Sequence, residues 1–182
     1  MNTKLEKKLA EEFPFMRRDP AALKQKYITD LYGAFGIECG DGWYGLIREM
    51  CAEITQVYVD LGIECCFNPI QIKEKYGTLR VYFGAENDEA HDKILQITFK
   101  YDKKSETVCE KCGEPGKMRE VNSWFSVKCD KCYTDLLSRY YPNTNIDRLL
   151  EVLEKVDKYV KEGLTEAEAV NKLREEYEDI LE

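Results

Sequence analysis

Two short cysteine motifs constrain the fold of this chain more strongly than any other feature. Cys109 and Cys112 form the first Cys-x-x-Cys pair, and Cys129 and Cys132 form the second. The spacing between the pairs is typical of a structural zinc site, because two such turns can point four sulfur atoms at one tetrahedral ion. We therefore predict that these thiolates bind one Zn²⁺. Four protein ligands leave no position for a reactive water, so the ion should stabilise the fold without catalysing a reaction.

An iron–sulfur site and a redox-active dithiol are the alternatives for the same four cysteines. The start of the chain lacks a signal-peptide core, and no apolar run approaches the roughly 20 residues that span a bilayer. We therefore expect a cytoplasmic protein with reduced thiols. The other cysteines match no metal motif. Cys39, Cys65 and Cys66 could join His91 only in an irregular site, and Cys51 is expected in the core.

The segment between the cysteine pairs predicts a zinc ribbon. A turn at Pro115-Gly116 should lead into two antiparallel strands over residues 117–121 and 124–128, joined by a turn at residues 122–123. Loss of a cysteine ligand should remove the metal and loosen residues 107–133.

The segment before the ribbon predicts helices. Two short helices are expected between residues 2 and 37, followed by a long helix over residues 43–61 whose apolar residues recur every three or four positions. Asp41 should cap the start of the long helix, and Gly62 should end it.

A β-hairpin is expected next, because apolar residues alternate with polar ones on both sides of Tyr76-Gly77. Ile70 and Ile72 should share its buried face. The helical pattern then returns from Asp88 to about residue 101, and the polar residues 102–106 should form a linker into the ribbon.

The segment after the ribbon predicts a helical hairpin. One helix is expected over about residues 146–161, with Leu153 and Val160 in its apolar stripe, and Gly163 should end it. Thr165 and Glu168 form a capping box for a last helix whose apolar face continues to Ile180. The expected fold class is α+β, with helices packed on a β-hairpin or small antiparallel sheet. Its domains are a body (1–104), an inserted four-cysteine zinc ribbon (105–133) and a C-terminal helical hairpin (134–182).

The chain offers no catalytic constellation. His91 is its only histidine, so no site that needs two imidazoles can form, and no phosphate loop, dinucleotide fingerprint or nucleophile elbow is present. We therefore expect a protein that binds partners and is not an enzyme.

The net charge and the aromatic residues indicate which kinds of partner the protein could bind. The net charge of −8 argues against a protein that coats nucleic acid, although basic residues of the ribbon leave a nucleic-acid-binding regulator as an alternative. A small-molecule sponge that binds nucleotides is a further alternative. Trp124 and Phe125 either pack within the protein or face a partner. The candidate partner or ligand surfaces are Trp43, Tyr44, Arg80, Tyr82, Trp124 and Phe125.

Three motifs together resemble a family of uncharacterised zinc-ribbon proteins of bacteriophages and prophages. They are Gly-Asp-Gly-Trp (40–43), Lys-Glu-Lys-Tyr-Gly-Thr-Leu-Arg (73–80) and Cys-Glu-Lys-Cys-Gly-Glu-Pro-Gly (109–116) with the second cysteine pair behind it. Family members often have histidine where this chain has Cys132. The resemblance implies a small accessory protein in the cytoplasm of an infected bacterium, acting by binding and inhibiting a host protein, such as one of antiviral defence. The oligomeric state is left open.

Overall fold

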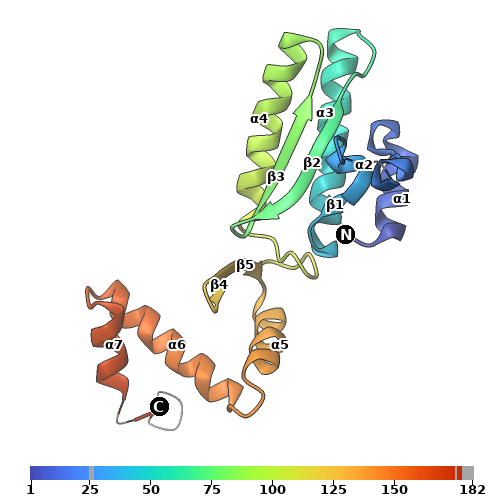
Figure 1. Ribbon diagram of the computed structural model, residues 1–182. Helices are drawn as coiled ribbons and strands as arrows, with labels where there is room; N and C mark the ends of the chain where they lie inside the picture. The colour runs from blue at the N-terminus through green and yellow to red at the C-terminus, as the bar shows by residue number, and fades with distance from the viewer. Residues whose placement is uncertain (25–26, 175, 178–182) are drawn as a thin grey trace. The chain divides into compact units, whose positions relative to one another are not determined.

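The computed structural model describes residues 1–24, 27–174 and 176–177, and it has an α+β fold (Figure 1). Two compact units divide the chain, residues 1–132 and residues 133–182. The first unit contains the predicted body and all four cysteines of the predicted ribbon. None of the described helices is both long and apolar enough to cross a membrane.

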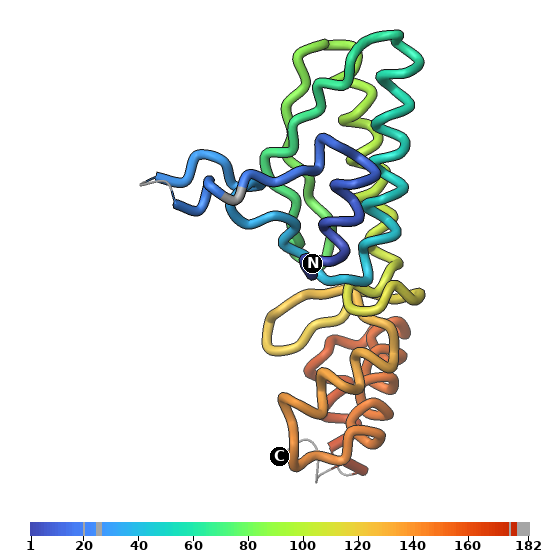
Figure 2. Tube along the Cα trace, turned by 90° about the vertical axis from the view of Figure 1, so that its right-hand side faces the viewer, coloured from blue at the N-terminus to red at the C-terminus, as the bar shows by residue number. Residues whose placement is uncertain are grey.

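The first unit is built on a three-stranded sheet in the order β1-β2-β3. β1 (Ile37–Glu38) runs parallel to β2 (Asn68–Lys75), and β2 runs antiparallel to β3 (Thr78–Gly84). Two long helices, α3 (Tyr44–Leu61) and α4 (Asp88–Ser105), pack against each other and form a layer on one side of the sheet (Figures 1 and 2).

The predicted long helix is confirmed as α3. Its apolar residues at steps of three and four are buried, and Gly62 ends it in the left-handed conformation. The predicted Asp41 cap is wrong. Asp41 begins a 3₁₀ turn, η3 (Asp41–Trp43), and its carboxylate accepts hydrogen bonds from the backbone and side chain of Asn2 at 2.7 and 2.6 Å.

The first segment of the chain is less helical than the sequence predicts. α1 (Thr3–Glu12) is followed by two 3₁₀ turns, η1 (Pro14–Met16) and η2 (Pro20–Lys24), and by the short helix α2 (Leu31–Phe35). Gly36 ends α2 at a φ of +69°. A side chain there would collide with the paired side chains of Glu6 and Arg18, so the close approach of this pair requires glycine.

The predicted hairpin is confirmed as β2 and β3, with Tyr76 and Gly77 both at positive φ in a two-residue turn. The pairing register shifts between Pro69 and Gln71. Because this irregularity turns the strand, Ile70 is exposed while Ile72 is buried, and the expectation that they share one buried face is wrong.

The predicted linker over residues 102–106 is also wrong, because α4 continues to Ser105. The buried Ser105 hydroxyl accepts a hydrogen bond from the Leu79 backbone N–H at 2.9 Å, and Asp102 forms an ion pair with Arg80. These contacts with β3 hold the polar end of the helix against the sheet.

The predicted ribbon hairpin is confirmed as β4 (Lys117–Val121) and β5 (Trp124–Lys128), which pair antiparallel. Asn122 and Ser123 form the connecting turn, with φ values of +51° and +62°. The helix that follows, α5 (Asp130–Tyr140), was not predicted; it begins between the last two cysteines and continues into the second unit.

The second unit contains the predicted helical hairpin, α6 (Ile146–Lys161) and α7 (Glu166–Leu173), with the Thr165/Glu168 capping box in place. Its small core is formed by Val152, Val156, Ala169, Leu173 and Tyr177. Leu153 and Val160 are exposed, contrary to the predicted stripe, because α6 packs on α7 along a narrower line. Ile180 lies outside the described residues.

Candidate metal centre

The four predicted ligands meet at one point. The sulfur atoms of Cys109, Cys112, Cys129 and Cys132 all lie within 4.8 Å of one another, and Cys112 Sγ lies 3.6 Å from both Cys129 Sγ and Cys132 Sγ. All four are free thiols, because a disulfide would bring two sulfurs to about 2.0 Å. This cluster could hold a metal ion.

Each cysteine pair is held by a local backbone turn. In the first, residues 109–112, the Gly113 N–H donates to the Cys109 carbonyl and the Cys109 N–H donates to the Glu114 carbonyl, both at 2.8 Å. Gly113 adopts a φ of +84°, which favours glycine. In the second, Cys132 lies in the first turn of α5, and its N–H donates to Cys129 Sγ at 3.4 Å.

The four cysteines differ in their burial and in the pKa of their thiols. Cys109 and Cys132 are buried, Cys129 is half-buried and Cys112 is exposed. Burial of Cys109 opposes its ionisation, but hydrogen bonds from backbone N–H groups outweigh this cost and lower its pKa to about 7. Burial raises the pKa of Cys132 to about 12. Backbone dipoles at the first turn therefore favour the thiolate form that a metal requires.

The Gly-Asp-Gly-Trp segment, residues 40–43, packs directly on the first cysteine turn. The Gly42 N–H donates to the Glu110 carbonyl at 2.9 Å, the Gly40 N–H donates to Glu110 Oε1 at 2.9 Å, and the Trp43 indole donates to the Val108 carbonyl at 2.8 Å. Side chains at Gly40 or Gly42 would collide with backbone atoms of that turn. Sequence reasoning missed this role, although the two glycines flanking one residue were a signal for close backbone approach.

Glu110 joins this segment to the ribbon. Its second carboxylate oxygen accepts a hydrogen bond from Lys128 Nζ at 3.1 Å, and both side chains are largely buried. The backbone N–H of Glu110 donates to the Val127 carbonyl at 3.0 Å. The hairpin motif also reaches the ribbon, because a side chain at Gly77 would overlap the Met118 thioether. The 40–43 motif thus packs on the metal centre itself, and the 73–80 motif contacts the hairpin of the ribbon.

Of the residues predicted to form a partner or ligand surface, some are exposed and others are buried or paired. The prediction is wrong for Trp43, which is fully buried beneath the first cysteine turn and cannot form a partner or ligand surface. Tyr44 is half-buried, and Arg80 is paired with Asp102. Tyr82, Trp124 and Phe125 are exposed, so the alternative that the two ribbon aromatics pack within the protein is not what the structure shows.

The remaining cysteines do not form a second cluster with His91 among the described residues. Cys39 and Cys51 are buried, and Cys65 is exposed. Cys66 is half-buried, with its sulfur 3.6 Å from the Tyr58 hydroxyl.

Comparisons of the chain with protein-family models, with curated proteins and with solved structures find no match, so the functional argument rests on the chain's own geometry.

Proposed function

We propose that this protein is a zinc-stabilised binding protein that uses its ribbon to contact, and inhibit, a protein of a bacterial host. The observation that carries this proposal is the exposure of Trp124 and Phe125, 69% and 43%, on a hairpin anchored to the cysteine cluster. The ion supplies rigidity, and the aromatic side chains supply contact area.

Zinc is the ion that the donor set favours. Four Zn–S bonds of about 2.3 Å in a tetrahedron place neighbouring sulfurs about 3.8 Å apart, close to the 3.6 Å separations of Cys112 from Cys129 and Cys132. With four thiolates bound, the ion has no open position for substrate or water. Its role is therefore to stabilise residues 107–132.

The contact surface proposed for the ribbon consists of Tyr76, Met118, Trp124 and Phe125, all exposed. By the pairing register, Met118 and Phe125 lie on one face of the hairpin, and Tyr76 neighbours Gly77, where an added side chain would meet Met118. Trp124 lies on the opposite face but adjoins the turn, so a partner that binds around the turn can contact both faces. Exposed Trp and Tyr dominate the binding energy of many protein interfaces, because they bury large areas at a small cost in side-chain entropy.

A host protein is proposed as the partner for two reasons. Of the three motifs that resemble phage proteins, one carries the first cysteine pair, one packs on it and the third contacts the ribbon hairpin through Gly77. The resemblance therefore covers the part of the molecule that holds the ribbon. The net charge of −8 would also speed association with a basic partner, including an enzyme that itself binds nucleic acid.

The first test is native mass spectrometry of tagged protein purified from bacterial cells. We expect one zinc ion per chain and a bound companion protein. Trp124→Ala should lose the companion and keep the zinc, whereas Tyr140→Ala, which removes an aromatic side chain exposed to 53%, should keep both. Retention of the companion by Trp124→Ala would refute the proposed surface, and iron in place of zinc would refute the proposed ion.

A nucleic-acid-binding regulator is the second candidate. By the pairing register, Lys117, Arg119 and Lys128 lie on the same face of the ribbon as Trp124. However, Lys128 is paired with Glu110 and Arg119 with Asp130, so this face offers little free positive charge to phosphates. Salt-dependent binding of DNA or RNA by the purified protein would favour this candidate instead.

A further inference from the structure

A second surface of the first unit has an incomplete hydrogen-bonding edge. β3 pairs with β2 alone, and among the described residues no strand covers its other edge. The Leu79 N–H donates to Ser105 of α4, so the backbone of Leu79 faces away from β2. Since alternate residues of a strand direct their backbone groups to the same edge, Val81 and Phe83 present their N–H and C=O groups outward.

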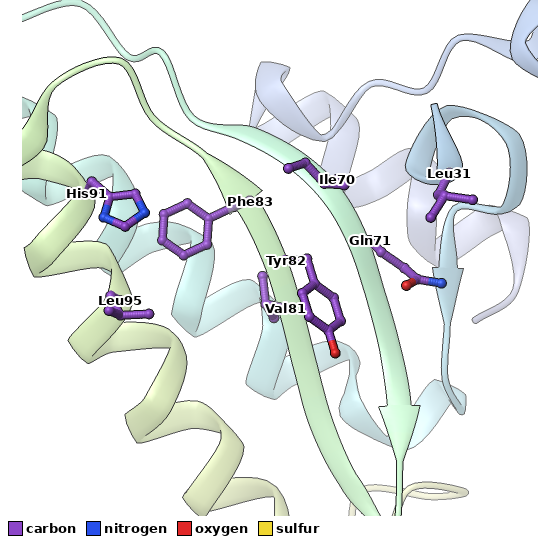
Figure 3. Close-up of a pocket in the computed structure, with 8 residues that line it drawn as sticks. All are labelled: Leu31, Ile70, Gln71, Val81, Tyr82, Phe83, His91 and Leu95. Atoms are coloured by element: carbon purple, nitrogen blue, oxygen red, sulfur yellow. The ribbon is translucent and has the colours of Figure 1, made fainter. Parts of the chain in front are cut away.

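Apolar side chains lie beside this edge and on the sheet surface next to it. A pocket of about 480 Å³ is lined by Leu31, Ile70, Gln71, Val81, Tyr82, Phe83, His91 and Leu95. Figure 3 shows Phe83 turned toward His91 and Leu95 of α4, whereas Tyr82 lies on the strands with Ile70 and Gln71, opposite Leu31 of α2. Successive side chains of an extended strand point to opposite faces, so a strand added at the outer edge would meet Phe83 and Leu95 on one face and Tyr82 on the other.

The side chain of Phe83, which lines the pocket, packs against other aromatic rings of the first unit. The Phe83 ring stacks on Phe67 at 5.4 Å and lies 5.1 Å from the His91 ring. Leu95 and Phe99, one turn apart on α4, extend the apolar surface and are exposed to 53% and 62%. The apolar surface is therefore built on packed elements and not on a loop.

Acidic residues near the pocket favour an occupant that carries positive charge. Where the chain leaves β3 and enters α4, the acidic residues Glu86, Asp88 and Asp92 are exposed. An occupant with Lys or Arg beside its apolar residues complements this rim. A second copy of the chain fits less well, because its own net charge of −8 opposes approach.

We propose that the outer edge of β3 binds an extended, apolar segment of another protein, flanked by basic residues, which adds as a strand beside Val81 and Phe83. This surface is distinct from the ribbon surface and does not depend on the metal. The occupant's backbone bonds to the edge, and its side chains contact Phe83 and Leu95 on one face and Tyr82 on the other.

The experiment is a selection of random twelve-residue displayed peptides on the full chain, with Leu95→Lys as the counter-target. Val59→Lys is the matched control, because Val59 is exposed to 65% on α3 and gains the same charge. We expect enriched peptides with alternating or consecutive apolar residues and a basic flank. They should bind Val59→Lys as they bind the original chain, and Leu95→Lys at least about tenfold more weakly.

Hydrogen exchange then separates strand addition from general adhesion. The best peptide should slow exchange at the amides of Val81 and Phe83, and methylation of alternate peptide nitrogens should abolish binding while keeping the side chains. The proposal is overturned if no peptide is enriched, or if binding survives methylation. It is also overturned if the unliganded chain forms a dimer that Leu95→Lys abolishes, since the occupant would then be a second copy.

Discussion

Gly42 packs directly on the backbone of two cysteine ligands, so its replacement should disturb metal binding. In Gly42→Ala the added methyl group would overlap backbone atoms of Cys109, Cys112 and Gly113, which belong to the first cysteine turn. Backbone cannot move aside as a flexible side chain can. We expect zinc to be released to a competing chelator at least about tenfold more readily, as measured by titration with a coloured chelator.

Gly45→Ala is the control for this change. Gly45 lies near the start of α3 with nothing within 4 Å of an added methyl group, and alanine is the better helix former. Its zinc affinity should equal that of the original chain. Equal zinc affinity in Gly42→Ala and Gly45→Ala would show that residues 40–43 do not hold the metal centre.

Glu6 should contribute more to stability than a surface carboxylate of the same chain. It is buried, accepts a hydrogen bond from the Ile37 backbone N–H at 2.9 Å, and pairs with Arg18 at 2.8 Å. Glu6→Gln removes the charge and leaves the half-buried Arg18 without its counter-ion. We expect a loss of about 2–3 kcal/mol in the free energy of unfolding, measured by urea denaturation.

The matched control is Glu12→Gln, which breaks an ion pair with the exposed Arg48. Solvent screens that pair, so its loss should change stability much less. If both variants unfold at the same urea concentration, the buried pair of Glu6 and Arg18 contributes no more to stability than the exposed pair of Glu12 and Arg48.

For single residues, the sequence predicts the four cysteine ligands well, and it predicts the residues that pack on them poorly. The four cysteines carry their role in local spacing, and the structure brings them together. Trp43 is a candidate partner or ligand surface in the sequence, yet its indole is buried and donates to the carbonyl of Val108, a residue far from it in the chain. Periodicity and spacing report local geometry, and contacts between distant segments leave little trace in either.

Among the elements, the turn of the ribbon hairpin carries backbone strain that one substitution should relieve. Ser123 adopts a φ of +62°, where glycine is favoured, and a two-residue hairpin turn prefers Asn-Gly over Asn-Ser. Ser123→Gly should therefore stabilise the ribbon by about 1 kcal/mol, seen as slower hydrogen exchange of β4 and β5. Ser123→Ala removes the same hydroxyl without relieving the strain and should bring no gain.

Elements defined by neighbouring residues were predicted well. Residues 146–161, 117–121 and 124–128 match α6, β4 and β5, because caps, turns and periodicity are local signals. β1 was not predicted, since a two-residue strand exists only through its parallel pairing with Ile72 and Lys73. The sequence predicts a linker over residues 102–106, because polar side chains give no sign of the contacts that Ser105 and Asp102 make with β3.

For the whole molecule, the structure gives each unit its own core. The large cluster of the first unit extends from α1 through the sheet to α4, and the small cluster of the second consists of side chains from α6, α7 and Tyr177. Among the described residues, the cysteine cluster is the one group of side chains that could hold a metal ion. The metal should therefore control a limited part of the chain.

Removal of the metal by a chelator tests this division. Without the metal, the four thiolates repel one another and nothing links the two cysteine pairs, so residues 107–132 should loosen. Residues 40–43 should loosen with them, because the Gly42 N–H donates to the Glu110 carbonyl. Hydrogen exchange should quicken there and stay slow in the buried parts of α3 and α4, while α6 and α7 exchange as before. Faster exchange throughout α3 and α4 would mean that the ion supports the entire first unit. Unchanged exchange at residues 107–132 would mean that it supports none, and that the rigid presentation of Trp124 has another origin.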